Sequence, residues 1–262
     1  IRHLLQLIWN QRKQNAWLWA ELLLVSVFLW FLVDYLYVMG RTYTAPLGFD
    51  IRHTYSIVIS SLSERSPDYI PKEKRERPDG VHLLTALDRI RAYPGVESAC
   101  LTDGGMPYYM GSRNLVWRID TLQVPCRYAF VTPEFFDVFR IYDKDGKTAS
   151  LKRAIEDNNS IVISADVETM NPGLSLLGQK AYRGNVTDEI EETIRGISVP
   201  IRRHEYTKAE PNAYRALRLS RMEEGYYEGM IDAVRLCVRV RPDVDNADFP
   251  ARFRKDMAEQ LR

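Results

Sequence analysis

Few side chains in this sequence have the types and the spacing that catalysis or metal binding needs. The motifs G-x-S-x-G of hydrolases and G-x-x-x-x-G-K-[ST] of ATPases are both absent. No pair of carboxylates stands out, and Asp103-Gly-Gly is typical of a turn after a strand. The histidines are scattered, with no partner four residues away and no cysteine at zinc-ligand spacing: His3, His53, His82 and His204. We therefore expect no enzyme activity, no cofactor and no metal site in this chain.

The three cysteines are too few and too scattered for a disulfide framework, and their odd number leaves at least one unpaired: Cys100, Cys126 and Cys237. Cys100 and Cys237 fall in apolar runs that favour strands. We interpret them as small core residues, with one disulfide as the alternative.

One loop has the composition of a binding surface. It follows Gly105 and contains two methionines and two tyrosines: Met106, Tyr108, Tyr109 and Met110. Such side chains adapt to many shapes and are enriched where proteins meet. We expect these four residues to contact a partner. The alternative is that they pack against a neighbouring β-rich part of the same chain.

The overall charge excludes a nucleic-acid partner. The chain has 36 Lys and Arg against 35 Asp and Glu, so no global basic field exists. Its mean hydropathy of −0.31 also excludes a polytopic membrane protein within these 262 residues.

The strongest feature is an apolar run from residue 16 to residue 39, in which only Glu21, Ser26 and Asp34 are not hydrophobic. As a helix, these 24 residues span roughly 36 Å, enough for a hydrocarbon core of about 30 Å. Aromatic residues suit interfacial belts at both ends of the run: Trp17, Trp19, Tyr35, Tyr37 and Tyr43. We predict one transmembrane helix over 16–39.

The flanking residues predict how this helix is oriented. Arg2, Arg12 and Lys13 precede it and favour a cytoplasmic N-terminus. Residues 1–15 are amphipathic and predict a helix on the cytoplasmic interface. A cleaved signal peptide is the first alternative, but the run ends without small residues at a cleavage site. A buried soluble helix is the second, but the run is hydrophobic all round.

The remaining residues predict an α+β fold: a two-lobed extracytoplasmic domain after a linker over 40–50. Residues 51–112 and 231–262 each combine alternating strand patterns with an amphipathic helix, and each is too small to fold alone. We expect them to share one discontinuous α/β lobe. Residues 113–230 have many short strand patterns and turn signals, so we expect an inserted β-rich lobe.

Several segments, taken in order, resemble the periplasmic core domain of macrolide-exporter (MacB) and FtsX-like ABC transporter permeases. The most specific is Phe130-Val-Thr-Pro-Glu-Phe-Phe-Asp-Val-Phe139 followed by Gly146. The others are Tyr93-Pro-Gly-Val-Glu-Ser98, Asn159-Ser-Ile-Val-Ile-Ser164, Leu176-Leu-Gly-Gln-Lys180, Arg195-Gly-Ile-Ser-Val199 and the segment 4–13 before the apolar run. One departure is the apolar run itself, which is rich in Trp and carries Glu21.

The resemblance implies a permease subunit in the bacterial inner membrane, with its main domain periplasmic. It implies a cytoplasmic ABC ATPase, a second permease copy, membrane lipid and a periplasmic protein or exported substrate as partners. It also implies that the natural chain continues beyond Arg262 into three more membrane spans. The alternative is an anchored sensor or ligand-binding domain of a signalling receptor, in which a second span leads to a kinase or coiled-coil segment.

Overall fold

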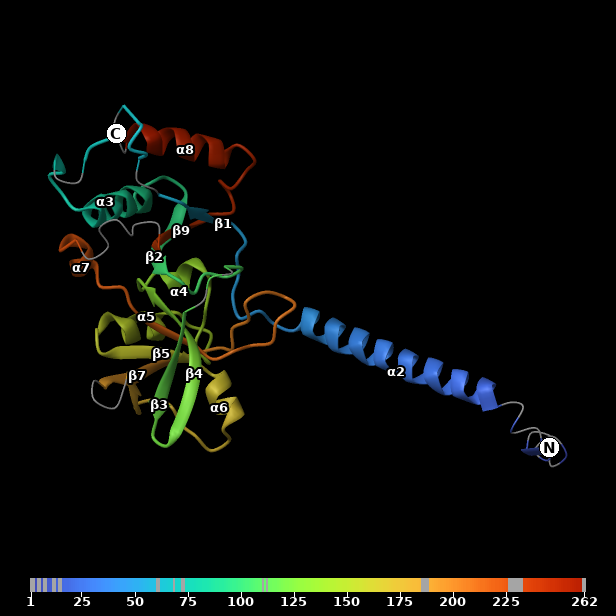
Figure 1. Ribbon diagram of the computed structural model, residues 1–262. Coiled ribbons are helices and arrows are strands. Elements are labelled where there is room, and N and C mark those ends of the chain that lie inside the picture. Colours follow the sequence, from blue (N-terminus) through green and yellow to red (C-terminus); the bar gives the residue numbers. More distant parts are fainter. Residues whose placement is uncertain are drawn as a thin grey trace. The chain divides into compact units, whose positions relative to one another are not determined.

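The computed structural model (Figure 1) describes two compact units, residues 1–46 with 205–207, and residues 47–204 with 208–262. Within these ranges it describes all positions except 1, 2, 4, 5, 7, 8, 11, 12, 14, 15, 60, 61, 68, 72, 73, 110, 112, 185–188, 226–232, 261 and 262. Met110 of the predicted contact loop and most of the predicted interfacial helix therefore lie outside the described residues.

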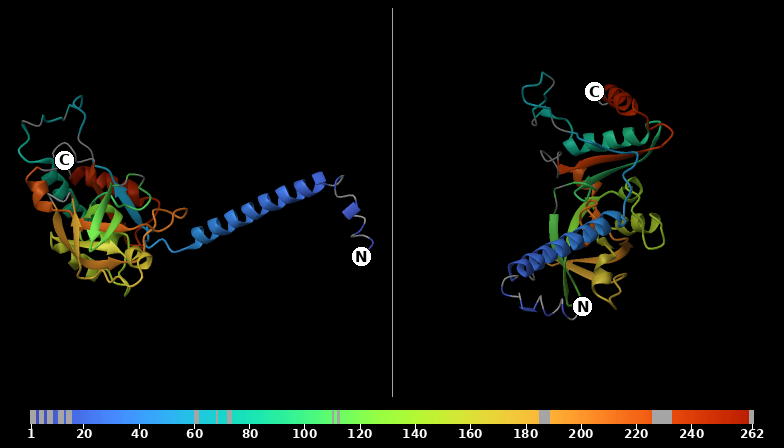
Figure 2. Two further views of the ribbon diagram at one scale, coloured as in Figure 1. Left: turned by 60° about the horizontal axis from the view of Figure 1, so that its bottom comes forward. Right: turned by 90° about the vertical axis from the view of Figure 1, so that its right-hand side faces the viewer.

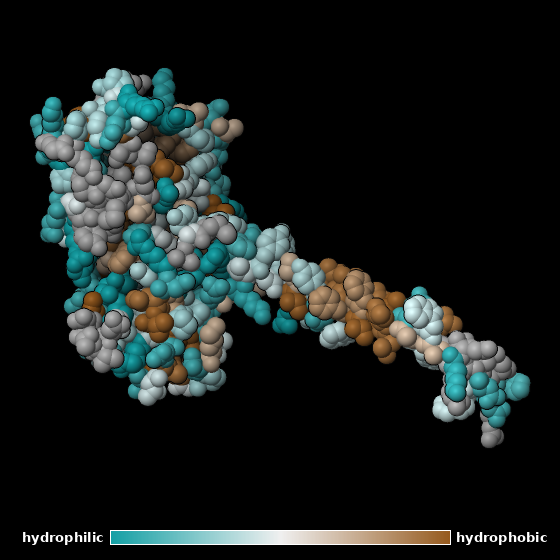
Figure 3. All heavy atoms as spheres, in the orientation of Figure 1, coloured by the Kyte–Doolittle hydropathy of each residue, from teal (hydrophilic) through white to brown (hydrophobic). Residues whose placement is uncertain are grey.

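The first unit is dominated by one long helix, α2 (Ala16–Thr44), in which no residue is buried. It is long and apolar enough to cross a membrane, and Figure 3 shows apolar residues over its middle. This agrees with the helix predicted from the sequence. The helix includes residues 40–44, which the sequence places in the linker. Near its end, the Tyr43 ring packs 5.7 Å from that of Tyr206.

The second unit is a mixed α/β domain built on a sheet in which nine strands are described. These strands are β1 (Thr54–Ile57), β2 (Val96–Asp103), β3 (Arg113–Ile119), β4 (Leu122–Val131), β5 (Ser160–Ser164), β6 (Lys180–Arg183), β7 (Ile190–Ser198), β8 (Asn212–Ala216) and β9 (Arg235–Val240). Their order is β1-β9-β2-β4-β3-β6-β7-β5-β8, and β4 also pairs with β8. In the described residues, one apolar helix precedes a mixed α/β domain, which confirms the predicted fold class, whereas the division into two lobes stays a prediction.

The extra pairing closes six strands into a small barrel. β8 is antiparallel to β5 on one side and parallel to β4 on the other, so β4, β3, β6, β7, β5 and β8 form a ring. Alternate side chains face the interior of a closed barrel. The interior core contains Trp117, Ile119, Val124, Cys126, Ile161, Ile163, Ala181, Ile194 and Ala213. Helix α6 (Asp166–Met170), which follows the end of β5, adds Val167 to this core.

Strands β1, β9 and β2 extend the sheet beyond the barrel and are covered by two helices. α3 (Asp79–Arg91) and α8 (Phe249–Gln260) lie near each other in Figure 1 and in the right-hand view of Figure 2. Both bury their apolar stripes in one core, as the sequence predicts for α8 from Phe249, Phe253 and Met257. The short helix α7 (Leu219–Glu223) adds Met222 to the same core.

A third core joins these two parts. It is formed by α4 (Phe135–Val138) and α5 (Ala149–Glu156) on strands β2, β4, β5, β8 and β9. Phe135 and Phe136 both pack on Tyr214 of β8, at ring distances of 5.5 and 5.6 Å. Both faces of the central strands are therefore buried, and the barrel is continuous with the strands that extend it.

Candidate functional site

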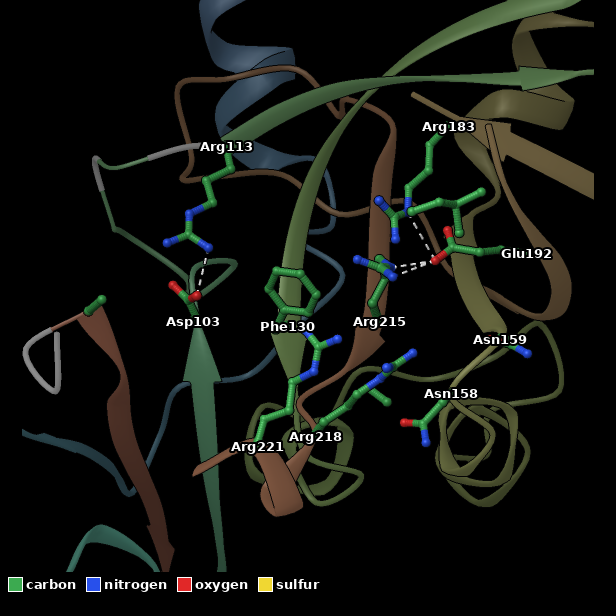
Figure 4. Close-up of a pocket in the computed structure, with 13 residues that line it drawn as sticks. Asp103, Arg113, Phe130, Asn158, Asn159, Arg183, Glu192, Arg215, Arg218 and Arg221 are labelled. Carbon is green, nitrogen blue, oxygen red and sulfur yellow. Dashed lines mark hydrogen bonds and ion pairs between the residues drawn. The ribbon is translucent and has the colours of Figure 1, made fainter. Parts of the chain in front are cut away.

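The mouth of the barrel contains a pocket of about 620 Å³. The residues of barrel strands that line it lie at one end of the barrel, where β3 and β7 begin and where β4, β6 and β8 end. Asp103, at the end of β2, and the two residues before β5 line it as well. The residues that line it (Figure 4) are Asp103, Arg113, Phe130, Asn158, Asn159, Arg183, Ile190, Glu192, Arg215, Ala216, Arg218, Arg221 and Ala233. Of these described residues, five are arginines and two are carboxylates.

Glu192 of β7 organises the inner wall of this pocket. Its side chain is 1% exposed and accepts hydrogen bonds from Arg215 Nε at 2.6 Å and Arg183 Nε at 3.2 Å. Its other oxygen accepts the indole N–H of Trp117 at 3.1 Å. A buried carboxylate needs such partners because transfer from water otherwise costs several kcal/mol. Glu192 thereby fixes two guanidinium groups at the mouth of an otherwise apolar barrel.

Arg215 is also held by an aromatic ring. It lies opposite Phe130 in the parallel register of β8 and β4, with its guanidinium carbon 4.9 Å from the ring centroid. Burial lowers the pKa of Arg215, and the positive charges of Arg183 and Arg218 lower it further, while Glu192 raises it. An arginine remains charged under such conditions. The pocket therefore contains a fixed, crowded cationic group.

The outer wall contains a second ion pair. Arg113, at the start of β3, binds the Asp103 carboxylate at 2.6 Å. Burial raises the pKa of Asp103, and the charge of Arg113 opposes that shift. The sequence places Asp103 in a simple turn. In the structure Asp103 ends β2 and is a buried wall residue of the pocket.

The rim of the pocket provides further cations. Arg218 and Arg221 lie at and within α7, and Figure 4 shows both side chains extending toward Arg215. Asn158 and Asn159 line the pocket from the turn before β5 and provide amide groups. The Arg218 carbonyl accepts the Arg221 N–H at 3.2 Å, whereas the Arg218 guanidinium has no ion-pair or hydrogen-bond partner among the residues that the structure describes.

A second arrangement ties the chain that follows α2 to the domain. Arg239 of β9 is 1% exposed and donates to the carbonyl of Val138 at 2.7 Å, to that of Arg52 at 2.8 Å, and to that of Asp50. The Asp50 N–H donates to the Phe139 carbonyl at 2.8 Å. We call this set of contacts, with Leu47 and Gly48 described next, the joint.

Leu47 and Gly48 complete the joint. The Leu47 carbonyl accepts the Arg202 N–H at 3.0 Å. Gly48 has φ +82°, and a Cβ there would lie 2.1 Å from the Pro200 carbonyl oxygen. Only glycine fits such an approach. The six residues 47–52 thus contact three segments that are distant in sequence.

The predicted contact loop has an inner and an outer side. Met106 packs against the third core, with its sulfur 3.5 Å from Cys237 Sγ. Tyr108 is 40% exposed, with φ +59° and its ring edge-on to Phe49 at 5.9 Å. Tyr109 is half-buried. The loop does not line the pocket at the barrel mouth.

No described cluster of three or more His, Cys, Asp or Glu side chains could hold a metal ion. The cysteines are unpaired and buried, and Cys100 of β2 lies opposite Cys237 of β9.

No protein-family model matches the sequence, and no curated protein matches it. Its fold is similar to a domain of a protein described as a permease from Porphyromonas gingivalis, at 19% identity and a TM-score of 0.48 over 68% of this chain and 69% of that one.

Two further solved structures are similar. One is the periplasmic region of MacB from Actinobacillus actinomycetemcomitans, at 11% identity and a TM-score of 0.47, covering 84% of this chain and 87% of that one. The other is the extracellular domain of the ABC-type transporter YknZ from Gram-positive bacteria, at 12% identity and a TM-score of 0.47, covering 79% and 92%. All three similarities are similarities of fold.

Proposed function

We propose that this chain is the first membrane anchor and the extracytoplasmic domain of an ABC transporter permease subunit. In this role it works with a cytoplasmic ABC ATPase and a second permease copy in the bacterial inner membrane. It passes the motion driven by ATP hydrolysis to a substrate or protein on the periplasmic side, and performs no catalytic step itself. The sequence resemblance and the apolar helix support this role.

The observation that carries the proposal is the joint. Within eight residues after the end of α2, the chain is hydrogen-bonded through Leu47 to the segment after β7, through Asp50 to the end of α4, and through Arg239 to β9. Because the joint residues touch parts that are far apart in sequence, a displacement of residues 47–52 moves the domain as one body. Such an attachment suits the transmission of force.

The proposal is tested with the natural full-length protein in lipid nanodiscs together with its ATPase. A spin label is placed at Arg254→Cys on the exposed side of α8, and the label is selective because Cys100, Cys126 and Cys237 are buried. The distance between labels on two copies is measured with ADP and with ATP. We expect the distance distribution to shift with ATP.

Arg239→Lys is the informative variant and Arg241→Gln its matched control. A lysine keeps the charge of Arg239 but cannot reach three carbonyls from one planar group, so we expect ATP hydrolysis to continue with a smaller shift. Arg241 directly follows the end of β9 and is exposed, so its variant should behave as the wild type. The proposal is contradicted if no ATPase activity accompanies the protein. It is also contradicted if ATP is hydrolysed and the distance between the labels does not change.

One exposed residue is proposed as a contact with the periplasmic partner. Tyr108 has a positive φ, which is costly for a bulky residue and often persists where function requires it. Tyr108→Gly removes the ring and the strain together. We expect unchanged or higher stability with lower transport. Full transport in this variant would show that the loop only packs against its own domain.

An anchored ligand-binding domain of a signalling receptor is the second candidate. The observation that favours it is the pocket of about 620 Å³, a volume typical of small-molecule sites. A label shift that follows a ligand and needs no ATPase would support the receptor.

A further inference from the structure

Among the described residues that line the mouth of the barrel, arginines outnumber carboxylates. Asp103 is matched by Arg113, and the single charge of Glu192 is shared between Arg183 and Arg215. Arg218 adds a further charge at the rim. Like charges held close together in a partly enclosed pocket repel each other and attract counter-ions.

The inner arginines are preorganised for an anion. Arg215 is bound to Glu192 and stacked on Phe130, and Arg183 is bound to the same carboxylate oxygen. Their side chains therefore lose little freedom when a ligand binds. A guanidinium presents its donors as a planar fork that matches carboxylate and phosphate oxygens. Glu192 is fully engaged by its three donors, so it does not compete for the ligand.

The rim completes the set of donors. Arg218 is half-exposed, and its guanidinium makes no ion pair or hydrogen bond with the described residues. Figure 4 shows it on the same side of the pocket as Asn158. Its guanidinium and the neighbouring amides can close over a ligand that the inner arginines hold. Phe130, Ile190 and Ala216 provide apolar wall for the rest of such a molecule.

We propose that the barrel mouth binds a small organic anion with two or more negative charges, carried by phosphate or carboxylate groups. The pocket volume of about 620 Å³ exceeds that of a simple inorganic ion and suits a ligand with an organic part. This inference is independent of the transport role, since the pocket belongs to the domain under either candidate function.

The test is calorimetric titration of the full chain in phosphatidylcholine nanodiscs with pyrophosphate and with citrate. We expect a Kd of about 1 mM or tighter for at least one of them, which weakens as salt is raised because exposed charges are screened. Arg218→Gln should weaken binding about tenfold, since one charge-assisted hydrogen bond is lost. Arg218 is half-exposed and makes no contact that the fold needs, so this variant should keep the wild-type melting temperature.

Arg254→Gln is the matched control, because it removes the same charge from the exposed side of α8, outside the pocket. Flotation with separate vesicles of phosphatidylcholine and phosphatidic acid distinguishes the source of the anion. If the protein floats with phosphatidic acid vesicles in a way that depends on Arg218, the ligand is a lipid headgroup. If only the soluble anions bind, the ligand is a free metabolite. The absence of binding, or equal weakening in both variants, overturns the proposal. The assay needs no ATPase, so its failure leaves the permease role intact.

Discussion

Arg215 of β8 lies directly opposite Phe130 of the parallel strand β4, with its guanidinium carbon 4.9 Å from the centre of the phenyl ring. This pairing exists only because β8 closes the ring of six strands. Closure places Arg215, Arg183 and Glu192 on the inner side of the barrel wall, where both guanidinium groups bind one oxygen of the buried Glu192 carboxylate. The stability of the barrel and the charge of its mouth therefore depend on the same residues.

Glu192→Gln tests this dependence. The substitution leaves Arg183 and Arg215 without their shared carboxylate in a largely buried setting. Removing one partner of a buried ion pair costs about 3–5 kcal/mol, so we expect a loss of that order in the free energy of unfolding by urea. The matched control is Glu191→Gln, since Glu191 precedes it on β7 but is exposed and pairs with Lys180 at the surface. A comparable loss in both variants would contradict a special role for Glu192.

Gly48 should be intolerant of even one added carbon. Gly48→Ala places a Cβ 2.1 Å from the Pro200 oxygen at φ +82°, so both a clash and backbone strain oppose it. Gly146→Ala has a similar φ of +76° but meets nothing within 4 Å. We expect a loss of about 1 kcal/mol for Gly146→Ala from the left-handed backbone alone, and a clearly larger one for Gly48→Ala. Thermal unfolding of both variants measures the difference, and equal losses would exclude the close approach seen at the joint.

The cysteines should behave as buried thiols. Burial raises the pKa of Cys126 to about 12 and that of Cys100 well above its usual value. Because the thiolate is the reactive form, we expect almost no reaction with a thiol reagent in the folded protein at pH 8. All three should react in guanidinium chloride. Two thiols fewer after unfolding would instead indicate a disulfide, and Cys100 with Cys237 is the pair whose register permits one.

The sequence predicts the elements that have a clear period. The stripe of Leu83, Leu87 and Ile90 predicts α3, and alternation from Val234 predicts β9. It does not predict β8, because Asn212–Ala216 is almost wholly buried on both faces and has no alternation. It also does not predict that Arg239 is buried, since a strand with arginines on one face favours an exposed face.

The pocket at the barrel mouth could not be predicted from the sequence. Arg113, Arg183 and Arg215 are separated by dozens of residues, and only the closure of the ring brings them together. The local signal is the spacing of Arg215, Arg218 and Arg221, three arginines at intervals of three residues. Charge runs of this kind usually mark a solvated helix face. The structure differs because α7 begins at the barrel mouth rather than on an open surface.

The last prediction concerns the contact between β1 and the loop before α8. One oxygen of the Asp245 carboxylate accepts a hydrogen bond from the Tyr55 hydroxyl, and the other lies 2.5 Å from His53 Nδ1. The bond from Tyr55, followed by that from His53, lowers the pKa of Asp245. The same bond, with burial, raises the pKa of Tyr55 to about 12. Because of these opposite shifts, the stability of the folded domain should change in two pH ranges, one acidic and one alkaline.

On the acid side, the pKa of Asp245 in the folded protein is below its unfolded value of about 3.9. Its contribution to the free energy of unfolding is therefore present above about pH 3.9 and is lost as the pH falls further. On the alkaline side, the contribution of Tyr55 is complete below its unfolded pKa of about 10 and is lost as the pH rises through about 12. Asp245→Asn should therefore cost about 1–2 kcal/mol at pH 7, and less below pH 4. Urea unfolding across the pH range measures this. Absorbance titration should show one tyrosine ionising near pH 12 that is lost in Tyr55→Phe, and a wild-type tyrosine titration unchanged by that substitution would show that the bond to Asp245 does not form.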